Sequence, residues 1–502
     1  MGAGFNIYGA FDLAQSALNR RVFDPGKAPA GEETPFGKLP VYMAFRPLKT
    51  SDFFFASGDG RESFQSKFAA RASVDVSVGA FSGHVEAAYG QQVAESSQYS
   101  YANMSFREAL GILVIEGLAE TQYLTDEFTA ALKALPDKAD KSNLDRFADF
   151  FQDFGAYFVS QIHVGATLEY YVAVHQSDSM KAAQISAKME AEYKGLFVSG
   201  KASAEMSSDE EWKSYRKSKT ASIRIKGGGD EERDVLNQVD TKSLDSMSQA
   251  TLDNYGRWLR SVAANAAVMD FRLTGIWEIC GAKRKAVEDA FREYGDMMRP
   301  KLQIETRTMV RGKDSYAPSV FLGGSLVPAD KPIVPDRGWG GYRLLVIDRR
   351  KPSLSGVKMS KLYSVPSGDG SQYQQVFAEM YKDLHDGGFV DNKYFFVLAT
   401  YGALNSFPPT PKFISQMQEA GAGPKLARWV ESAGGSIGTA GIKAGVNYIL
   451  VGIMKSGPGA GVEALGLFPT TPYVPHTSSV VVSFYSLGAG RPYVLGSAEV
   501  KA

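Results

Sequence analysis

FADFFQDFGAYFVSQIHVGATLEYYVAV, residues Phe147–Val174, is the stretch that decides the fold. Its aromatic residues recur at helical spacing and complete a helical pattern over Leu144–Phe154. Gly155 stands where helices commonly end, because glycine adopts a left-handed backbone without steric cost. The run Tyr157–Val174 has the composition of a strand. A helix, a glycine and a strand therefore follow one another without a linker.

Similar patterns on both sides divide the chain into three parts. Residues 1–300 form the first domain, whose other expected elements are helices at Leu124–Leu135, Leu252–Ala264 and Arg284–Met298 and a strand at Thr220–Lys226. Residues 301–340 are rich in proline and glycine, which indicates a connector with surface strands. Residues 341–502 alternate short apolar runs with helical patterns, which indicates a smaller α/β domain.

Two segments alternate strictly between apolar and polar side chains. In the first, the phase changes once near Ala80, and Asp75, His84 and Glu86 lie on the polar phase. The second changes phase near Gly195 and consists largely of good helix formers. A sequence that suits a helix by propensity and a strand by pattern is expected of a segment that refolds.

Side chains of a strand point alternately to opposite faces, and about 9–11 tilted residues cross a bilayer core. We therefore expect residues 66–100 and 176–217 to be stored compactly in water and to become two membrane hairpins. The lipid-facing residues of the first hairpin are Ala72, Val74, Val76, Val78, Phe81, Val85, Ala87 and Tyr89. Those of the second are Ala183, Ile185, Ala187, Met189, Ala191, Tyr193, Leu196, Val198, Ala202 and Ala204. The lumen-facing residues are Asp75, Glu86, Lys188, Glu190, Glu192, Lys201 and Glu205. The alternative is a pair of amphipathic strands in a soluble sandwich, each with one wet face.

The opening stretch also resembles the signature of the membrane-attack-complex/perforin (MACPF) family. The signature places an aromatic residue, six spacers, a second aromatic, Gly, Thr, His and a third aromatic in a row. The residues at these positions are Phe147, Phe154, Gly155, Ala156, Tyr157 and Phe158. Ala156 and Tyr157 stand where the family has Thr and His, and the other four match.

The flanks of the signature extend the resemblance over residues 1–300. The matching segments, in family order, are Gly2–Asp12, Leu124–Asp137, Trp212–Gly229 and Thr251–Cys280. The resemblance implies an α+β fold in which two helical clusters flank a bent four-stranded antiparallel sheet. It also implies that the clusters unfurl into transmembrane hairpins after subunits assemble in a ring. The two alternating segments fall where these clusters belong.

Three consecutive glycines, Gly227, Gly228 and Gly229, end the strand that returns from the second segment. They can take dihedral angles closed to other residues, so they are candidate hinges for opening the sheet. An ordinary turn is the alternative.

The C-terminal part is similar to the small GG domain of interleukin-like epithelial–mesenchymal inducer proteins. The stretches that carry this looser resemblance are Trp339–Arg350, Asp391–Gly402, Ala427–Ser436 and Val446–Gly457. In pore-forming proteins such an extra domain implies recognition of a protein, glycan or lipid receptor.

Composition limits the other classes of function. The chain has 55 basic and 55 acidic residues, so no net charge draws it to nucleic acid. It has one cysteine, Cys280, and five histidines without metal-ligand spacing, and it carries no nucleotide-binding or hydrolase motif, so we expect no disulfide, metal, cofactor or catalysis. We also expect no secretory signal and no helical membrane span, hence a protein made soluble and released by lysis or a dedicated exporter.

These observations favour a bacterial-type pore-forming toxin. Cytosolic storage with release on lysis suits a cytolytic toxin that acts on insect or other animal cells. A family member that binds membranes or partners without perforating them is the alternative, and an enzyme with an unrecognised site in the α/β domain is a third.

Overall fold

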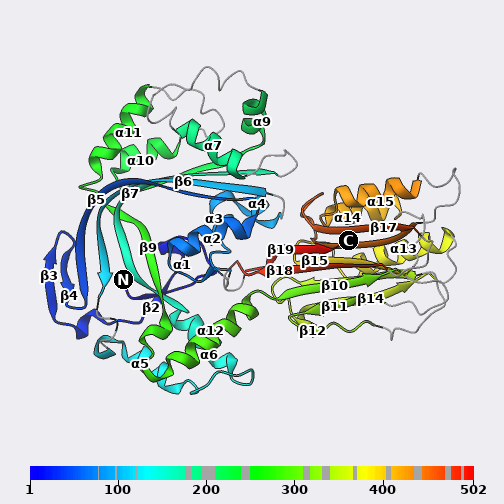
Figure 1. Cartoon of the computed structure of the whole chain (residues 1–502), viewed down its shortest axis with the longest axis horizontal. Coiled ribbons are helices and arrows are strands. Elements are labelled where there is room, and N and C mark those ends of the chain that lie inside the picture. Colours follow the sequence, from blue (N-terminus) through cyan, green and yellow to red (C-terminus); the bar gives the residue numbers. More distant parts are fainter. Residues whose placement is uncertain are drawn as a thin grey trace. The chain divides into compact units, whose positions relative to one another are not determined.

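One long strand, β7 (Tyr157–His175), organises the first half of the chain in the computed structural model (Figure 1). One edge of β7 pairs with β6 (Tyr99–Ile115), which pairs in turn with β5 (Met43–Gly58). The other edge is shared, because β9 (Ala267–Gly275) pairs with the first part of β7 and β8 (Thr220–Lys226) with the second. All these pairs are antiparallel. The expected sheet is therefore present, and two consecutive strands occupy its fourth position.

The structure describes residues 1–76, 79–96, 99–116, 118, 121–175, 182–193, 210–238, 249–308, 317–330, 340–365, 370–402, 409–434, 444–469, 476–487 and 491–501. The chain divides into two units. The first comprises Met1–Val93 and Tyr99–Asp296, and the second Ala94–Gln98 and Met297–Ala502. Two short strands, β1 (Ala3–Phe5) and β2 (Ala17–Arg21), extend the sheet of the first unit beside the start of β7, and α1 (Leu13–Ser16) lies between them in sequence.

The sheet of the first unit bends along a row of irregular pairings. Pro47 opposes Gly111, Gly111 opposes Val164 and Val164 opposes Val268 across four strands. The register shifts at or beside each of these pairs, and the next residue of β7, Gly165, has a φ of +155°. Because bulges bend strands and increase their twist, this row of irregular pairings accounts for the bend of the sheet that Figure 1 shows.

Helices cover both faces of this sheet. The inner cluster, which comprises α2 (Arg61–Arg71) and α3 (His84–Tyr89), lies on the concave side (Figure 1). The opposite face carries α7 (Ala182–Tyr193), α9 (Glu210–Ser218), α10 (Asp230–Asn237) and α11 (Gln249–Ser261). We use outer cluster for α7 and α9. Successive side chains of β7 serve the two faces: the Tyr171 ring contacts the inner cluster, whereas Tyr170 packs against the outer cluster.

The remaining elements before residue 300 are β3 (Ala30–Thr34), β4 (Gly37–Pro40), α4 (Gln91–Glu95), α5 (Asp126–Ala134), α6 (Leu144–Phe154) and α12 (Arg284–Met298). Of these, α5, α6 and α12 lie at the lower part of the sheet in Figure 1. The α6 helix carries a stripe of phenylalanines, of which Phe154 packs on Phe128 of α5 and Phe151 on Tyr294 of α12. These rings fix α6 in place, so that Gly155 can start β7 at the correct point.

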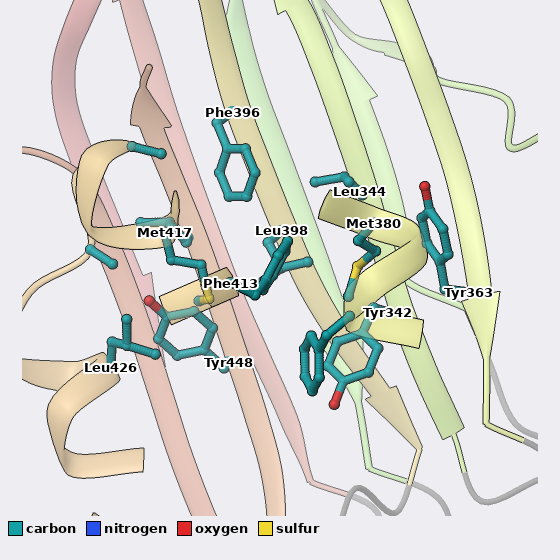
Figure 2. Packing of buried hydrophobic residues seen from close by; sticks show 14 of the residues in the cluster. Tyr342, Leu344, Tyr363, Met380, Phe396, Leu398, Phe413, Met417, Leu426 and Tyr448 are labelled. Atoms are coloured by element: carbon teal, nitrogen blue, oxygen red, sulfur yellow. The ribbon is translucent and has the colours of Figure 1, made fainter. Parts of the chain in front are cut away.

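The second unit contains two five-stranded sheets. The first has the order β14–β13–β15–β16–β17, and the second β12–β11–β10–β18–β19. Their bounds are β10 (Lys301–Arg307), β11 (Ser319–Leu322), β12 (Ser325–Leu326), β13 (Gly340–Asp348), β14 (Val357–Ser364), β15 (Tyr394–Gly402), β16 (Ala444–Ile453), β17 (Val462–Pro469), β18 (Thr477–Tyr485) and β19 (Val494–Lys501). One hydrophobic core lies between the sheets. A second core joins the first sheet to α13 (Gly370–Asp386), α14 (Pro411–Glu419) and α15 (Pro424–Gly434), as Figure 2 shows.

The second unit includes residues that we expected in a connector with surface strands. Residues 301–326, which we expected in a connector, supply three strands to its second sheet. Sequence patterns could not predict this pairing, because β10 pairs with β18, about 175 positions later, and patterns report only on nearby residues. The predicted alternation of strands and helices is present, and its strand pairs are antiparallel.

Candidate functional site

In the inner cluster, the predicted lipid-facing residues are mostly buried. Ala72, Val74, Phe81, Val85 and Tyr89 are in the core, Ala87 is half-buried and Val76 is exposed. On the polar phase Asp75 is exposed and Glu86 is half-buried, and Val78 lies outside the described residues. The alternating segment forms helices and turns here, with its apolar side chains turned away from water.

In the outer cluster, the buried side chains of the second segment recur with the period of a helix and not with that of a strand. Ile185 and Met189, four positions apart on α7, are buried, whereas Ala183 and Ala187 are exposed. Ala191 and Glu190 are half-buried, and Tyr193 ends the helix. Two predicted lumen-facing residues, Lys188 and Glu192, are buried in this arrangement. The remaining predicted residues, Leu196, Val198, Lys201, Ala202, Ala204 and Glu205, lie outside the described residues.

A buried ion-pair network attaches the inner cluster to the sheet. The Nε atom of Arg71, the last residue of α2, lies 2.9 Å from Oδ2 of Asp270 on β9. The same oxygen lies 3.1 Å from Nη1 of Arg107 on β6, and Arg107 also pairs with Asp52 on β5. One carboxylate thus binds two guanidinium groups in a buried site, where each charge depends on the others for stabilisation.

This network also crosses the bend of the sheet. Asp270 is paired in register with His163, on one side of Gly165, whereas Arg107 is paired with Thr167, on the other side. The ion pair between Asp270 and Arg107 therefore connects the two halves of the bent sheet on its concave face. The guanidinium of Arg71 is the third charged group of this network, and it lies 4.3 Å from the ring centroid of Phe54 on β5.

A second buried network attaches the outer cluster. The Nζ atom of Lys219, beside the start of β8, lies 2.8 Å from Oε1 of Glu192 on α7, and both side chains are at most 4% exposed. The other carboxylate oxygen accepts hydrogen bonds from the hydroxyls of Tyr170 and Tyr215, at 2.9 and 3.3 Å. Burial and then the neighbouring Tyr215 and Glu192 raise the pKa of Tyr170 far above its ordinary value, so this hydroxyl remains a donor.

The candidate hinge glycines lie at the junction of β8 and β9. Gly227 and Gly228 have φ angles of +72° and +77°, and Nε1 of Trp258 on α11 donates to the Gly227 carbonyl at 2.9 Å. A Cβ atom on Gly228 would lie 2.2 Å from Cδ1 of Trp258. Gly229 caps the start of α10. The backbone therefore favours glycine at both positions, and at Gly228 the tryptophan also leaves no space for a side chain.

The signature residues form the buried start of the sheet. Phe147, Phe154, Ala156, Tyr157 and Phe158 are all buried. Gly155 ends α6 with a φ of +79°, and a Cβ atom there would lie 2.5 Å from the backbone nitrogen of Phe5 on β1. The glycine predicted to cap the helix does so, and it also lets β1 approach β7.

Sequence reasoning did not identify Asp270 and Lys219 as partners of the two clusters. The signal for Asp270 was a single carboxylate within the apolar strand sequence of β9, since an isolated buried charge needs a partner. Other kinds of site find no support in the described part of the chain. There, no group of three His, Cys, Asp or Glu side chains is placed to hold a metal ion, and no helix is long and apolar enough to cross a bilayer.

A bent antiparallel sheet with helical clusters on opposite faces defines a perforin-like protein. The family model of the MAC/Perforin domain matches residues 1–301, and the chain belongs to this family. Members of the family act on membranes and oligomerise, and they are generally not enzymes. No curated protein sequence matches the chain.

Several solved structures are similar to this chain. GNIP1Aa from Chromobacterium piscinae is 18% identical, with a TM-score of 0.47, over 73% of this chain and 75% of its own. A MAC/Perforin-domain protein from Bacteroides thetaiotaomicron is 13% identical, with a TM-score of 0.40, over 66% of this chain and 70% of its own. The cytotoxin suilysin from Streptococcus suis is 8% identical, with a TM-score of 0.21, over 90% of this chain and 64% of its own.

Proposed function

We propose that this protein is a pore-forming toxin that assembles into a ring on a target membrane and inserts both alternating segments as β-hairpins. The observation that carries the proposal is the position of the two segments in the sheet. The first connects β5 to β6, and the second connects β7 to β8, and both pairs are adjacent and antiparallel. Each segment can therefore become a hairpin by extending a pair of strands that already exists.

The four strand ends also lie at the same end of the sheet. Gly58 of β5 is paired with Tyr101 of β6, Tyr99 with His175 of β7, and Ala173 with Thr220 of β8. Extension from these residues would continue one four-stranded ribbon. In that ribbon the apolar phase of each segment would meet lipid and the charged phase, with Lys188 and Glu192, would face water.

Assembly must precede insertion for a physical reason. A lone ribbon has two edges, whose unpaired N–H and C=O groups each cost several kcal/mol in lipid. A closed ring of ribbons has no free edge. The proposed order is membrane binding, ring assembly, release of the two clusters and insertion. Gly227 and Gly228 would serve as the hinge for this step. The second unit would recognise a protein, glycan or lipid receptor, and insect or other animal cells are the proposed target after release from the producing cell.

Dye release from target-cell membranes or from liposomes tests this function. The sharpest variant is a reversible lock on the inner cluster, in a Cys280→Ser background. The hydroxyl of Ser222 on β8 donates to the carbonyl of Ala88 on α3 at 2.9 Å, so Ala88→Cys with Ser222→Cys ties α3 to the sheet. A second lock joins α7 to β6.

Either lock should allow binding to membranes and abolish leakage until a reductant is added. The single variant Ser222→Cys is the matched control and should remain active. Leakage from oxidised protein with both clusters locked would remove the assignment of the two segments. Binding without leakage under every condition, in the unlocked protein, would instead support a non-lytic family member.

A further inference from the structure

His84, the first residue of α3, lies in an aromatic cage between the inner cluster and the sheet. The side chain is 1% exposed. Its ring centroid lies 4.3 Å from that of Phe68, 5.6 Å from that of Tyr171 and 6.1 Å from those of Phe11 and Phe64. These rings come from α2, from β7 and from the segment before α1, so the imidazole lies where the three meet.

The hydrogen bonds of this ring fit only its neutral form. Nδ1 accepts a hydrogen bond from the backbone N–H of Phe11 at 3.3 Å, which leaves the proton on Nε2. Nε2 is buried and has no hydrogen-bond partner among the described residues. A second proton would have to enter at Nδ1, where it would face the Phe11 N–H instead of an acceptor. The imidazolium would then carry two buried donors without acceptors.

The charges around the cage also oppose a positive ring. Three cations face it, Arg71 from α2 and Arg224 and Lys226 from β8, against one carboxylate, Asp12, which already pairs with Lys226 at 2.7 Å. Two tyrosines also lie at the cage, Tyr171 of β7, whose hydroxyl donates to Glu169, and Tyr89 of α3, and Glu86 lies on α3 itself. Burial first, and these cations second, lower the pKa of His84 from 6.5 to about 3.

We propose that His84 is an acid-sensitive release switch for the inner cluster: protonation of its ring drives α2 and α3 off the sheet. His84 lies on the polar phase of the first alternating segment, so in an extended hairpin it faces water and is free to take up a proton. The closed cluster excludes that proton, whereas the released segment accepts it. As a trigger for insertion, the switch rests on the proposed pore-forming function.

The sign of the effect follows from linkage. Above pH 6.5 the ring is neutral in both states, and the closed cluster has its full stability. As the pH falls from 6.5 towards 3, the open state binds one more proton than the closed state. The opening equilibrium should therefore rise about tenfold per pH unit, or on the order of a hundredfold between pH 7 and pH 4.5.

Hydrogen exchange of the α2 and α3 amides in the soluble full-length protein, without membranes, measures this opening. Exchange rates corrected for the intrinsic effect of pH give the opening equilibrium at each pH. Two non-titrating variants isolate the contribution of His84: His84→Asn keeps an acceptor for the Phe11 N–H, and His84→Phe keeps the shape of the ring. The wild-type protein should open one proton more steeply with falling pH than either variant.

His163→Gln is the matched control, because His163 is a partly buried histidine of β7 whose pKa is also lowered, first by burial. This variant should keep the wild-type slope. The proposal is overturned if His84→Asn and His84→Phe open as steeply as the wild type, or if His163→Gln removes the slope equally. Dye release at pH 7 and pH 5 separates the two proposals: acid-driven opening without leakage at either pH rejects the pore and keeps the switch.

Discussion

The Nε atom of Arg71 lies 2.9 Å from Oδ2 of Asp270, and the two residues are 199 positions apart in the chain. Arg71 ends the first helix of the inner cluster, and Asp270 belongs to the strand that borders the bend of the sheet. Release of the cluster must therefore break this pair and leave Asp270 with Arg107 alone. One buried carboxylate therefore contributes both to the attachment of α2 and to the ion pair that crosses the bend of the sheet.

Replacement of this carboxylate gives the first prediction. Asp270→Asn leaves the buried guanidinium of Arg71 without its counter-charge, whereas Arg107 keeps its second partner, Asp52, and we expect the first unit to lose about 3–5 kcal/mol of unfolding free energy. Urea unfolding measures this loss. Glu278→Gln, which removes the partner of Arg284 from an exposed pair, is the control and should cost less than about 1 kcal/mol. Equal effects of the two variants would show that the buried network does not stabilise the unit.

The outer cluster gives a prediction about compensation. Glu192→Gln leaves the fully buried ammonium of Lys219 without its counter-charge and should weaken the attachment of α7 by about 3–5 kcal/mol. The double variant Glu192→Met with Lys219→Met removes both charges and should recover part of this loss, because apolar side chains can replace a buried ion pair, although the Tyr170 and Tyr215 hydroxyls lose their acceptor. Hydrogen exchange of the α7 amides reports both effects. A double variant less stable than the single one would contradict the assignment.

The glycines at the end of β8 give a steric prediction. A methyl group at Gly228 would lie 2.2 Å from Cδ1 of the buried Trp258 and would force a φ of +77° on a residue with a side chain. We expect Gly228→Ala to cost about 1–2 kcal/mol for the backbone and about 1–3 kcal/mol more for overpacking. Gly281→Ala is the control in the same unit, since Gly281 has a φ of +53° and open space around it.

Urea unfolding and tryptophan fluorescence follow these two variants. Gly228→Ala should shift the emission of Trp258 as well as the unfolding midpoint, whereas Gly281→Ala should change the midpoint alone. The steric argument is rejected if both variants lose the same stability with unchanged fluorescence.

The only thiol should be inert in the native protein. Cys280 is buried, its Sγ atom lies 3.1 Å from the Ile276 carbonyl oxygen, and burial raises the pKa of the thiol to about 12. Because the thiolate is the reactive form, a chromogenic disulfide reagent at pH 8 should react slowly before unfolding and with one equivalent after it. Cys280→Ser should react in neither state. Rapid, stoichiometric reaction of the native wild-type protein would contradict this prediction.

Local signals were sufficient for much of the first unit. The bounds of α6, α12 and β8 agree with the sequence patterns, because the phenylalanine stripe, the cap at Gly155 and the glycines after Lys226 all act over a few residues. The pairing of distant strands left weaker traces. The edge strand β5 contains Pro47 and many exposed residues, so it has no alternation that would reveal it.

The assignment of side chains to lipid and lumen in the hairpins stays a prediction. In the structure, helix α7 buries Lys188 and Glu192, although the alternating pattern places both on its polar phase. Their surroundings could not be predicted, because the partner of Glu192 is Lys219, beside the start of β8, and the partner of Arg71 is on β9. The alternation of this segment predicts a strand, its residue propensities favour the helix that the structure shows, and the contacts of that helix depend on the rest of the chain.

The arrangement around β7 also sets an order of events during synthesis. Phe5 of β1 is paired with Tyr157, and Tyr157 with Gly275 of β9, so both edges of β7 close only after some 275 residues have left the ribosome. Until then β1 lacks β7, and β7 lacks β9. These distant pairings give the unit a high contact order, which makes its folding slow. Nascent chains stalled before Gly275 should consequently need chaperone protection.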